Sequence, residues 1–255
     1  MENLKILKNY WRQALNYKPS FSDLPYVIQG VGIAFAFGML FYDSYIAVIA
    51  LLPIVIPWFI YQKRLEKIRN RRIIGIQFMD AMISVTTNLK AGYSIENAFR
   101  EAGKDMVLLY GKKSMICSYL NRIYKGIANN IPLEKLLINF GNESENTDIQ
   151  DFAGVFAIAK KSGGNMTEII SRSVYVISKK IEVEKEIDVL VSAKRMEARI
   201  MNLVPFFIIL YVSITSPGFF SPLYHNLFGI ILMSLCMGVY IGAYLLSEKI
   251  VNITV

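Results

Sequence analysis

The chain has 255 residues, of which 54% are hydrophobic and 19% are charged, and its net charge is +8. Together with a positive mean hydropathy, this apolar share exceeds what the core of a soluble domain of this length can bury. The charged residues in turn exclude a chain that is embedded in lipid along its whole length. We therefore expect a membrane protein with a substantial water-facing part.

Residue types that support metal or redox chemistry are scarce. The chain has one histidine and two cysteines, Cys117 and Cys236, whose separation fits no metal-ligand or redox motif. No nucleophile is accompanied by a base at a recognisable spacing. We expect no catalytic residue, no metal and no cofactor.

The first apolar stretch predicts a transmembrane hairpin. Residues 1–25 are mixed and polar, and no cleavage site follows them, so we expect this segment to be retained. Residues 26–61 contain one charged residue, Asp43, between two arms that are each about as long as a minimal spanning helix. Asp43 is expected at the hairpin tip, where a carboxylate costs little, and a functional acid inside the membrane is the alternative. Pro53 and Pro57 predict a kink in the second arm.

A second apolar stretch, residues 201–247, contains no Asp, Glu, Lys or Arg. Proline and glycine around residues 216–222 divide it into two further spans, which predicts a second hairpin followed by a short tail, residues 248–255. Gly238 and Gly242 have the spacing that permits close helix approach. The chain is thus expected to have four transmembrane helices.

The distribution of basic residues predicts the orientation. Of the 28 Lys and Arg, 23 lie in residues 62–200, and neither predicted outer turn contains one. By the positive-inside rule, we expect both termini and the middle segment in the cytoplasm.

Six basic residues directly follow the first hairpin: Lys63, Arg64, Lys67, Arg69, Arg71 and Arg72. We interpret this basic cluster as a topology signal and a contact for anionic lipid, with docking of a partner protein as the alternative. Because the cluster lies beside the membrane, it does not indicate nucleic-acid binding.

Residues 62–200 show helical periodicity almost throughout, which predicts an all-α fold in which two hairpins flank a cytoplasmic helical bundle. Six helices are expected. The first continues from the second span to Gly92, and the second runs from Ser94 towards Gly103. The others cover residues 112–128, 131–141 and 147–162, and the last starts at Asn165. Residues 141–146 are expected to form a surface loop, and Thr147 with Gln150 a capping box. No Pro or Gly occurs between Asn165 and Pro205, so the last helix should run for about forty residues into the third span.

Three segments are candidates for function. The first is a glycine corner followed by a capped helix. The second is a double-glycine corner that lacks the Gly-x-x-x-x-Gly-Lys-[Ser/Thr] arrangement and the preceding strand of a phosphate-binding loop. The third is a polar run before the third span, whose glutamate has no nucleophile nearby to serve as a general acid. Their residues are Gly92 and Ser94, then Gly163, Gly164 and Asn165, and finally Glu197 and Arg199.

In this order, the three segments resemble the F-domain membrane proteins of type II secretion and type IV pilus systems, in particular the TadB and TadC platform proteins of the tight-adherence (Flp) pilus. The resemblance covers about residues 77–205. Larger family members carry two copies of the cytoplasmic domain, whereas this chain has no internal repeat. The matched positions are Leu89, Gly92, Ser94 and Ile95; Gly163, Gly164, Asn165 and Met166; and Ala193, Glu197, Ala198 and Arg199.

The resemblance implies a non-catalytic platform in the inner membrane that couples a hexameric secretion ATPase to the extraction of pilin subunits from the bilayer. It also implies an oligomer and a second F-domain protein as partner. A small membrane transporter or channel component is the alternative, although the predicted spans contain few polar residues.

Overall fold

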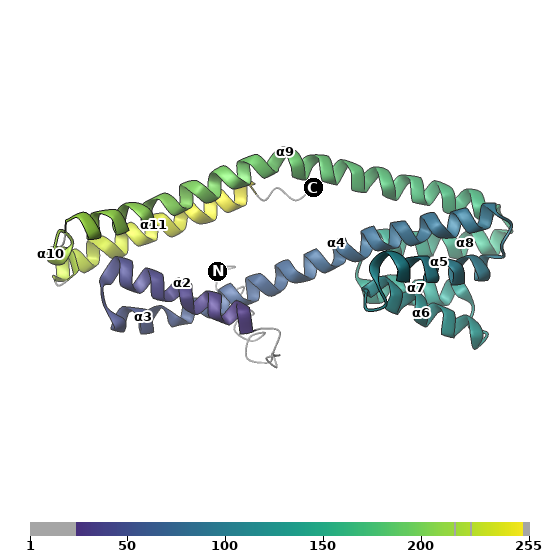
Figure 1. Ribbon diagram of the computed structural model, residues 1–255, viewed down its shortest axis with the longest axis horizontal. Helices are drawn as coiled ribbons and strands as arrows, with labels where there is room; N and C mark the ends of the chain where they lie inside the picture. Colours follow the sequence, from purple (N-terminus) through teal and green to yellow (C-terminus); the bar gives the residue numbers. More distant parts are fainter. Residues whose placement is uncertain (1–23, 217, 225, 252–255) are drawn as a thin grey trace, which may run out of the picture. The chain divides into compact units, whose positions relative to one another are not determined.

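The computed structural model describes residues 24–216, 218–224 and 226–251. Every regular element in these ranges is a helix, which confirms the all-α class (Figure 1). The chain divides into two compact units: an apolar unit of residues 1–65 and 187–255, and a helical domain of residues 66–186. Most of the predicted segment 1–25 and the end of the tail lie outside the described residues.

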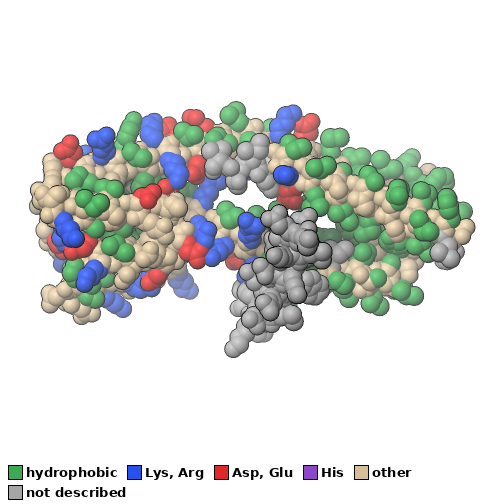
Figure 2. Space-filling model, turned by 180° about the vertical axis from the view of Figure 1, so that it is seen from behind, with side chains coloured by type: hydrophobic (Ala, Val, Ile, Leu, Met, Phe, Trp, Pro, Cys, Tyr) green, Lys and Arg blue, Asp and Glu red, His purple; other side chains and the backbone are tan. Residues whose placement is uncertain are grey.

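Three described helices are long and apolar enough to cross a membrane: α2 (Leu24–Tyr42), α9 (Met166–Thr215) and α11 (Leu227–Val251). A fourth is obtained if α3 (Tyr45–Leu51) and α4 (Val55–Lys90) count as one span. Hydrophobic side chains dominate the surface of the apolar unit (Figure 2).

The second apolar arm is bent, as its prolines predict. Between α3 and α4 the chain forms a short 3-10 turn, η2 (Leu52–Ile54), which contains Pro53. The two helices are bent by 48° at this break. Asp43 lies in the turn between α2 and α3 with a φ of 43°.

Small residues allow α2 to approach its neighbours closely. Gly30, Ala34 and Gly38 recur every four residues and are buried. A Cβ at Gly38 would lie 2.4 Å from Val48 Cγ2 and 2.9 Å from the Val48 backbone nitrogen. Any larger side chain at Gly38 would therefore push α2 away from α3.

The close approach that was predicted at Gly238 and Gly242 is not found. A Cβ at either position would meet nothing within 4 Å. Aromatic rings instead join the helices of the apolar unit: Phe206 of α9 lies 5.2 Å from Phe37 of α2 and 5.3 Å from Tyr240 of α11 between ring centroids. Both pairs are edge-to-face, a favoured ring geometry.

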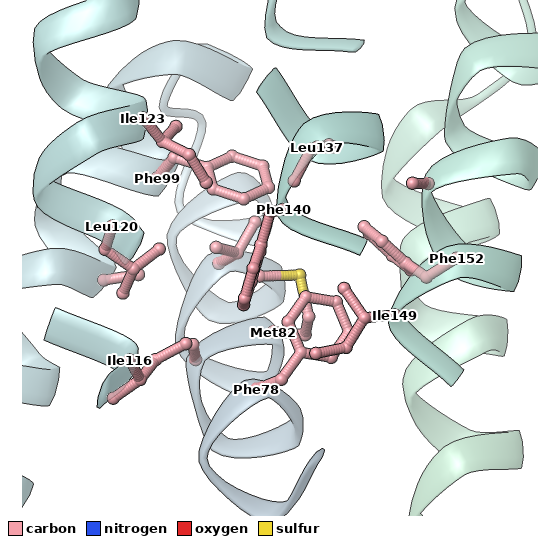
Figure 3. Close-up of a cluster of buried hydrophobic side chains, with 14 of the residues drawn as sticks. Phe78, Met82, Phe99, Ile116, Leu120, Ile123, Leu137, Phe140, Ile149 and Phe152 are labelled. Atoms are coloured by element: carbon pink, nitrogen blue, oxygen red, sulfur yellow. The ribbon is translucent and has the colours of Figure 1, made fainter. Parts of the chain in front are cut away.

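The helical domain packs the end of α4 and the start of α9 with four shorter helices. These are α5 (Ile95–Tyr110), α6 (Met115–Ala128), α7 (Leu133–Ser144) and α8 (Thr147–Ser162). Phe78 and Met82 of α4 are fully buried at the centre of the core (Figure 3). The Phe78 ring lies 5.7 Å from Phe140 and 5.2 Å from Phe152. Burial of side chains of this size stabilises a fold by roughly 1.5–3 kcal/mol each.

Two helices run past the glycines that were expected to end them. Helix α5 continues through Gly103 and ends at Gly111, whose φ is 79°. Helix α7 continues through Gly141 to Ser144, so the surface loop predicted for residues 141–146 is wrong. Gly141 belongs to a helix contact, because a Cβ there would lie 3.0 Å from Gln150 Cα of α8.

The cap of α8 also differs from the prediction. Asn146, not Thr147, is the N-cap, and its Oδ1 accepts a hydrogen bond from the Ile149 backbone N–H at 3.2 Å. The Gln150 side chain donates to the Gly141 carbonyl at 3.3 Å instead of closing a capping box. The predicted start of the helix was therefore one residue late.

Helix α9 has 50 residues and passes through Pro205, so it is longer than predicted. Near its start, Ile170, Ile177 and Ile181 are buried in the core of the helical domain. Near its end, Phe206 packs in the apolar unit. One uninterrupted helix therefore contributes to both units.

We expect Gly38→Val to lower the thermal unfolding midpoint of the detergent-solubilised chain, because overpacking of a close contact costs about 1–3 kcal/mol. Gly32→Val is the matched control, since a Cβ at Gly32 meets nothing within 4 Å. Circular dichroism measures both midpoints, and equal midpoints would contradict the packing described for α2.

Candidate functional site

The first predicted corner forms as expected. Gly92 has a φ of 90°, and the Tyr93 N–H donates to the Asn88 carbonyl at 3.1 Å, which closes the end of α4. The Ser94 hydroxyl then accepts a hydrogen bond from the Asn97 N–H at 3.4 Å. The chain thus turns from α4 into α5 with most of its end groups satisfied.

The second predicted corner has the same construction. Gly163 has a φ of 67°, and the Gly164 N–H donates to the Ala159 carbonyl at 3.2 Å. The Asn165 Oδ1 accepts a hydrogen bond from the Glu168 N–H at 3.3 Å. A Cβ at Gly164 would lie 3.1 Å from Ile169 Cδ1. Gly163 therefore suits the turn because of its positive φ, and Gly164 because of the limited space beside it.

An ion cluster brings the two corners to one end of the helical domain. The Lys160 ammonium lies 3.0 Å from Glu134 Oε2 and 3.9 Å from Glu96 Oε1. These three residues belong to the end of α8, the start of α7 and the start of α5. Glu96 lies two residues after Ser94, and Lys160 lies three residues before Gly163. The contact between Glu96 and Lys160 therefore places the two corners side by side. We name this part, residues 92–96, 134 and 160–165, the corner end.

The carboxylate of Glu134 is stabilised in its charged form. A hydrogen bond from its own backbone amide, followed by the hydrogen bond from Lys160, lowers the pKa of Glu134 below its usual value. The position at the start of α7 also favours negative charge. Glu134 therefore favours its charged form and can pair with the Lys160 ammonium at the corner end.

The corner end lies far from the points where the chain enters and leaves the domain. The chain enters at Glu66 and follows α4 to Lys90, and it returns along α9 from Met166 to Glu186. At 1.5 Å per residue, the corner end is roughly 30 Å away along these helices. It thus lies at the opposite ends of these two helix segments from Glu66 and Glu186.

Part of the basic cluster has a partner inside the domain. The Lys67 ammonium lies 2.7 Å from Glu145 Oε2, and Arg71 also pairs with Glu145. The Asn146 amide donates to the Arg71 carbonyl at 2.9 Å. These contacts hold the turn between α7 and α8 against α4, so Lys67 and Arg71 have a structural role that the sequence did not indicate.

The other members of the cluster are placed differently. Lys63 lies over the Tyr26 ring, with its nitrogen 5.6 Å from the ring centroid. Arg64, Arg69 and Arg72 are exposed along α4. A contact with lipid or a partner protein therefore remains a prediction for these three arginines.

The polar run before the apolar part of α9 is paired along its own helix. The Lys194 ammonium lies 2.8 Å from Glu197 Oε2, and Arg195 lies 3.4 Å from Asp188. Arg199 is exposed nearby. Glu197 and Arg199 belong to the apolar unit, whereas the corner end belongs to the helical domain.

Sequence reasoning missed Lys160, Glu96, Glu134 and Glu145. Glu96 and Lys160 lie within the two corner segments and Glu134 lies outside them. The packing of α5, α7 and α8 brings the three together. Glu145 has a left-handed backbone, with a φ of 49°, and directly precedes the Asn146 cap. The sequence signal for the start of α8 is therefore the only local indication that Glu145 lies in a turn.

The described residues include no group of three or more His, Cys, Asp or Glu side chains arranged to hold a metal ion. Comparisons of the chain with protein-family models, with curated proteins and with solved structures found no match.

Asn146→Ala removes the cap of α8 and the hydrogen bond to Arg71. Loss of a cap costs about 1 kcal/mol, so we expect amide exchange at the start of α8 to become about fivefold faster. Hydrogen–deuterium exchange with mass spectrometry of the full chain measures this rate. Thr147→Ala should change it far less, and the opposite ranking would restore the sequence-based assignment of the cap.

Proposed function

We propose that this chain is a non-catalytic assembly platform in the inner membrane that serves a type II secretion or type IV (Flp/Tad) pilus system. It couples the motion of a cytoplasmic hexameric ATPase to the assembly of pilin or pseudopilin subunits. The observation that carries the proposal is the corner end, where the two family-like motifs meet at a site remote along α4 and α9 from the apolar helices.

The proposed topology has four spans in two hairpins, over residues 26–61 and 201–247, with both termini and the helical domain in the cytoplasm. The three long apolar helices and the bent α3–α4 pair support this arrangement. The excess of Lys and Arg in residues 62–200 supports the orientation.

Long helices suit the transmission of a displacement. Both α4 and α9 have one end in the core of the helical domain and continue without a loop into the apolar unit. Packed helices move as rigid elements, whereas flexible loops absorb motion. A force applied at the corner end would thus reach the membrane helices through two continuous helices.

The proposed partners follow from the two units. The ATPase docks at the corner end, pilin subunits contact the apolar helices, and a second F-domain protein supplies the domain that this single-domain chain lacks. The exposed Arg64, Arg69 and Arg72 contact anionic lipid. The chain acts as an oligomer and binds no nucleic acid.

Gly163→Val should abolish pilus or pseudopilus assembly while the protein still inserts in the membrane. A β-branched residue at a φ of 67° is strained by about 1–2 kcal/mol, which reshapes the corner. Gly163→Asn should retain assembly, because Asn adopts left-handed backbone readily. Surface pili and the amount of the chain in the membrane fraction are measured together, and normal piliation of Gly163→Val would refute the assigned role of this corner.

The decisive experiment is affinity capture of the tagged chain from gently solubilised membranes, with mass spectrometry of the co-purified proteins. Recovery of a secretion-type ATPase and a second F-domain protein would support the platform. Recovery of the chain alone, or with a solute-binding protein, would contradict it and favour the transporter alternative.

A further inference from the structure

A groove between α5 and α6 concentrates positive charge. It has a volume of about 560 Å³, and Arg100, Lys104 and Lys112 line it. None of its described lining residues is Asp or Glu. Glu101 pairs with Lys104 at 2.9 Å and with Arg100 at 3.6 Å, so one carboxylate offsets part of this charge and the groove remains positive.

The floor of the groove is apolar and is kept open by a glycine. Phe99, Val107 and Leu120 line it, together with the half-exposed Tyr124. A Cβ at Gly103 would meet only Leu120 Cβ, at 3.9 Å. A larger side chain at this position would therefore fill the groove without displacing the backbone.

The size of the groove limits what can occupy it. A whole helix, about 10–12 Å across, does not fit in this volume. Two or three side chains of a helix that lies along the opening do fit. The suitable occupant is a helix face that presents carboxylates beside apolar side chains.

Such a face occurs on this chain, on the outer side of α9 within the helical domain. Tyr175, Glu182, Val183 and Glu186 share it, because spacings of seven, eight and eleven residues bring side chains to one side of a helix. Tyr175 is 64% exposed and Val183 51% exposed. Lys179 lies on the same face and pairs with Glu182 at 2.6 Å, so the face keeps a net negative charge.

We propose that the α5–α6 groove of one copy binds this acidic face of α9 from a second copy. The charges are complementary, and the aliphatic and aromatic side chains of the face match the apolar floor. The two surfaces lie on different elements, so each copy can use both at once. Such head-to-tail contacts form closed rings or open chains of subunits. The inference names the surfaces of the oligomer in the proposed function and rests on no other part of that function.

Charge exchange tests the contact in the full chain. Copies with donor and acceptor fluorophores are reconstituted in liposomes, and energy transfer is followed as the protein-to-lipid ratio changes. Lys104→Glu with Lys112→Glu should weaken association at least tenfold, as should Glu182→Lys with Glu186→Lys. A mixture of the two double variants pairs a reversed groove with a reversed face and should recover association.

The two double variants also separate a specific contact from general repulsion. The first lowers the positive net charge of the chain and the second raises it, so simple repulsion would strengthen association in one and weaken it in the other. Loss in both, with recovery in the mixture, supports the proposal. A change of opposite sign in the two variants overturns it.

A pair of glycine variants provides a charge-free test. Gly103→Leu fills the groove and should weaken association, whereas Gly154→Leu, in the open on α8, should leave it unchanged. Thermal unfolding of each variant checks that the fold is retained. A monomeric wild-type chain, or equal association of the two glycine variants, overturns the proposal. Normal self-association in the groove variants would assign the groove to a different acidic partner and would likewise overturn it.

Discussion

The continuity of α4 and α9 is the constraint on which the rest of the chain depends. A helix makes its backbone hydrogen bonds within itself, which a polypeptide requires wherever it lies in lipid. Pro205 of α9 lacks one such donor, yet the helix continues through it. The same two helices contribute Phe78, Met82 and Ile170 to the core of the helical domain. The shorter helices α5 to α8 fill the sequence between them, so the domain is an insertion between two long helices.

The two units differ in how their helices pack. In the helical domain, large side chains such as Phe78 and Phe156 are withdrawn from water, and their burial drives folding. In lipid no comparable force brings helices together, so close contact and directed interactions matter more. Gly30 and Gly38 provide the close contact, and Tyr240 provides a directed one through its hydrogen bond to the Asn202 carbonyl at 2.9 Å.

Local chemistry made much of the fold predictable. The positive φ of Gly92 and Gly163, and the caps at Ser94 and Asn165, follow from short sequence signals, and the structure confirms them. Predictions failed where packing overrides local preference. Gly141 was expected to end a helix because glycine lowers helix stability, yet its small size serves the contact between α7 and α8.

The candidate site was only partly predictable for a related reason. Both corners could be identified from the sequence, but their meeting could not, because it depends on how α5, α7 and α8 pack. Lys160 lies at the start of the double-glycine segment, but its role becomes visible only with Glu96 and Glu134 beside it. The sequence predicted a single role for the basic cluster. In the structure, Lys67 and Arg71 pair with Glu145 and so have a structural role.

The positive φ of the glycines in the two corners also limits which substitutions these positions can accept. A single-nucleotide change in a glycine codon introduces Ala, Val, Ser, Cys, Trp, Arg, Asp or Glu, and never Asn. Of these, Asp is the residue that most often adopts a positive φ. The corners at Gly92 and Gly163 therefore have very few one-step mutational neighbours that preserve the turn.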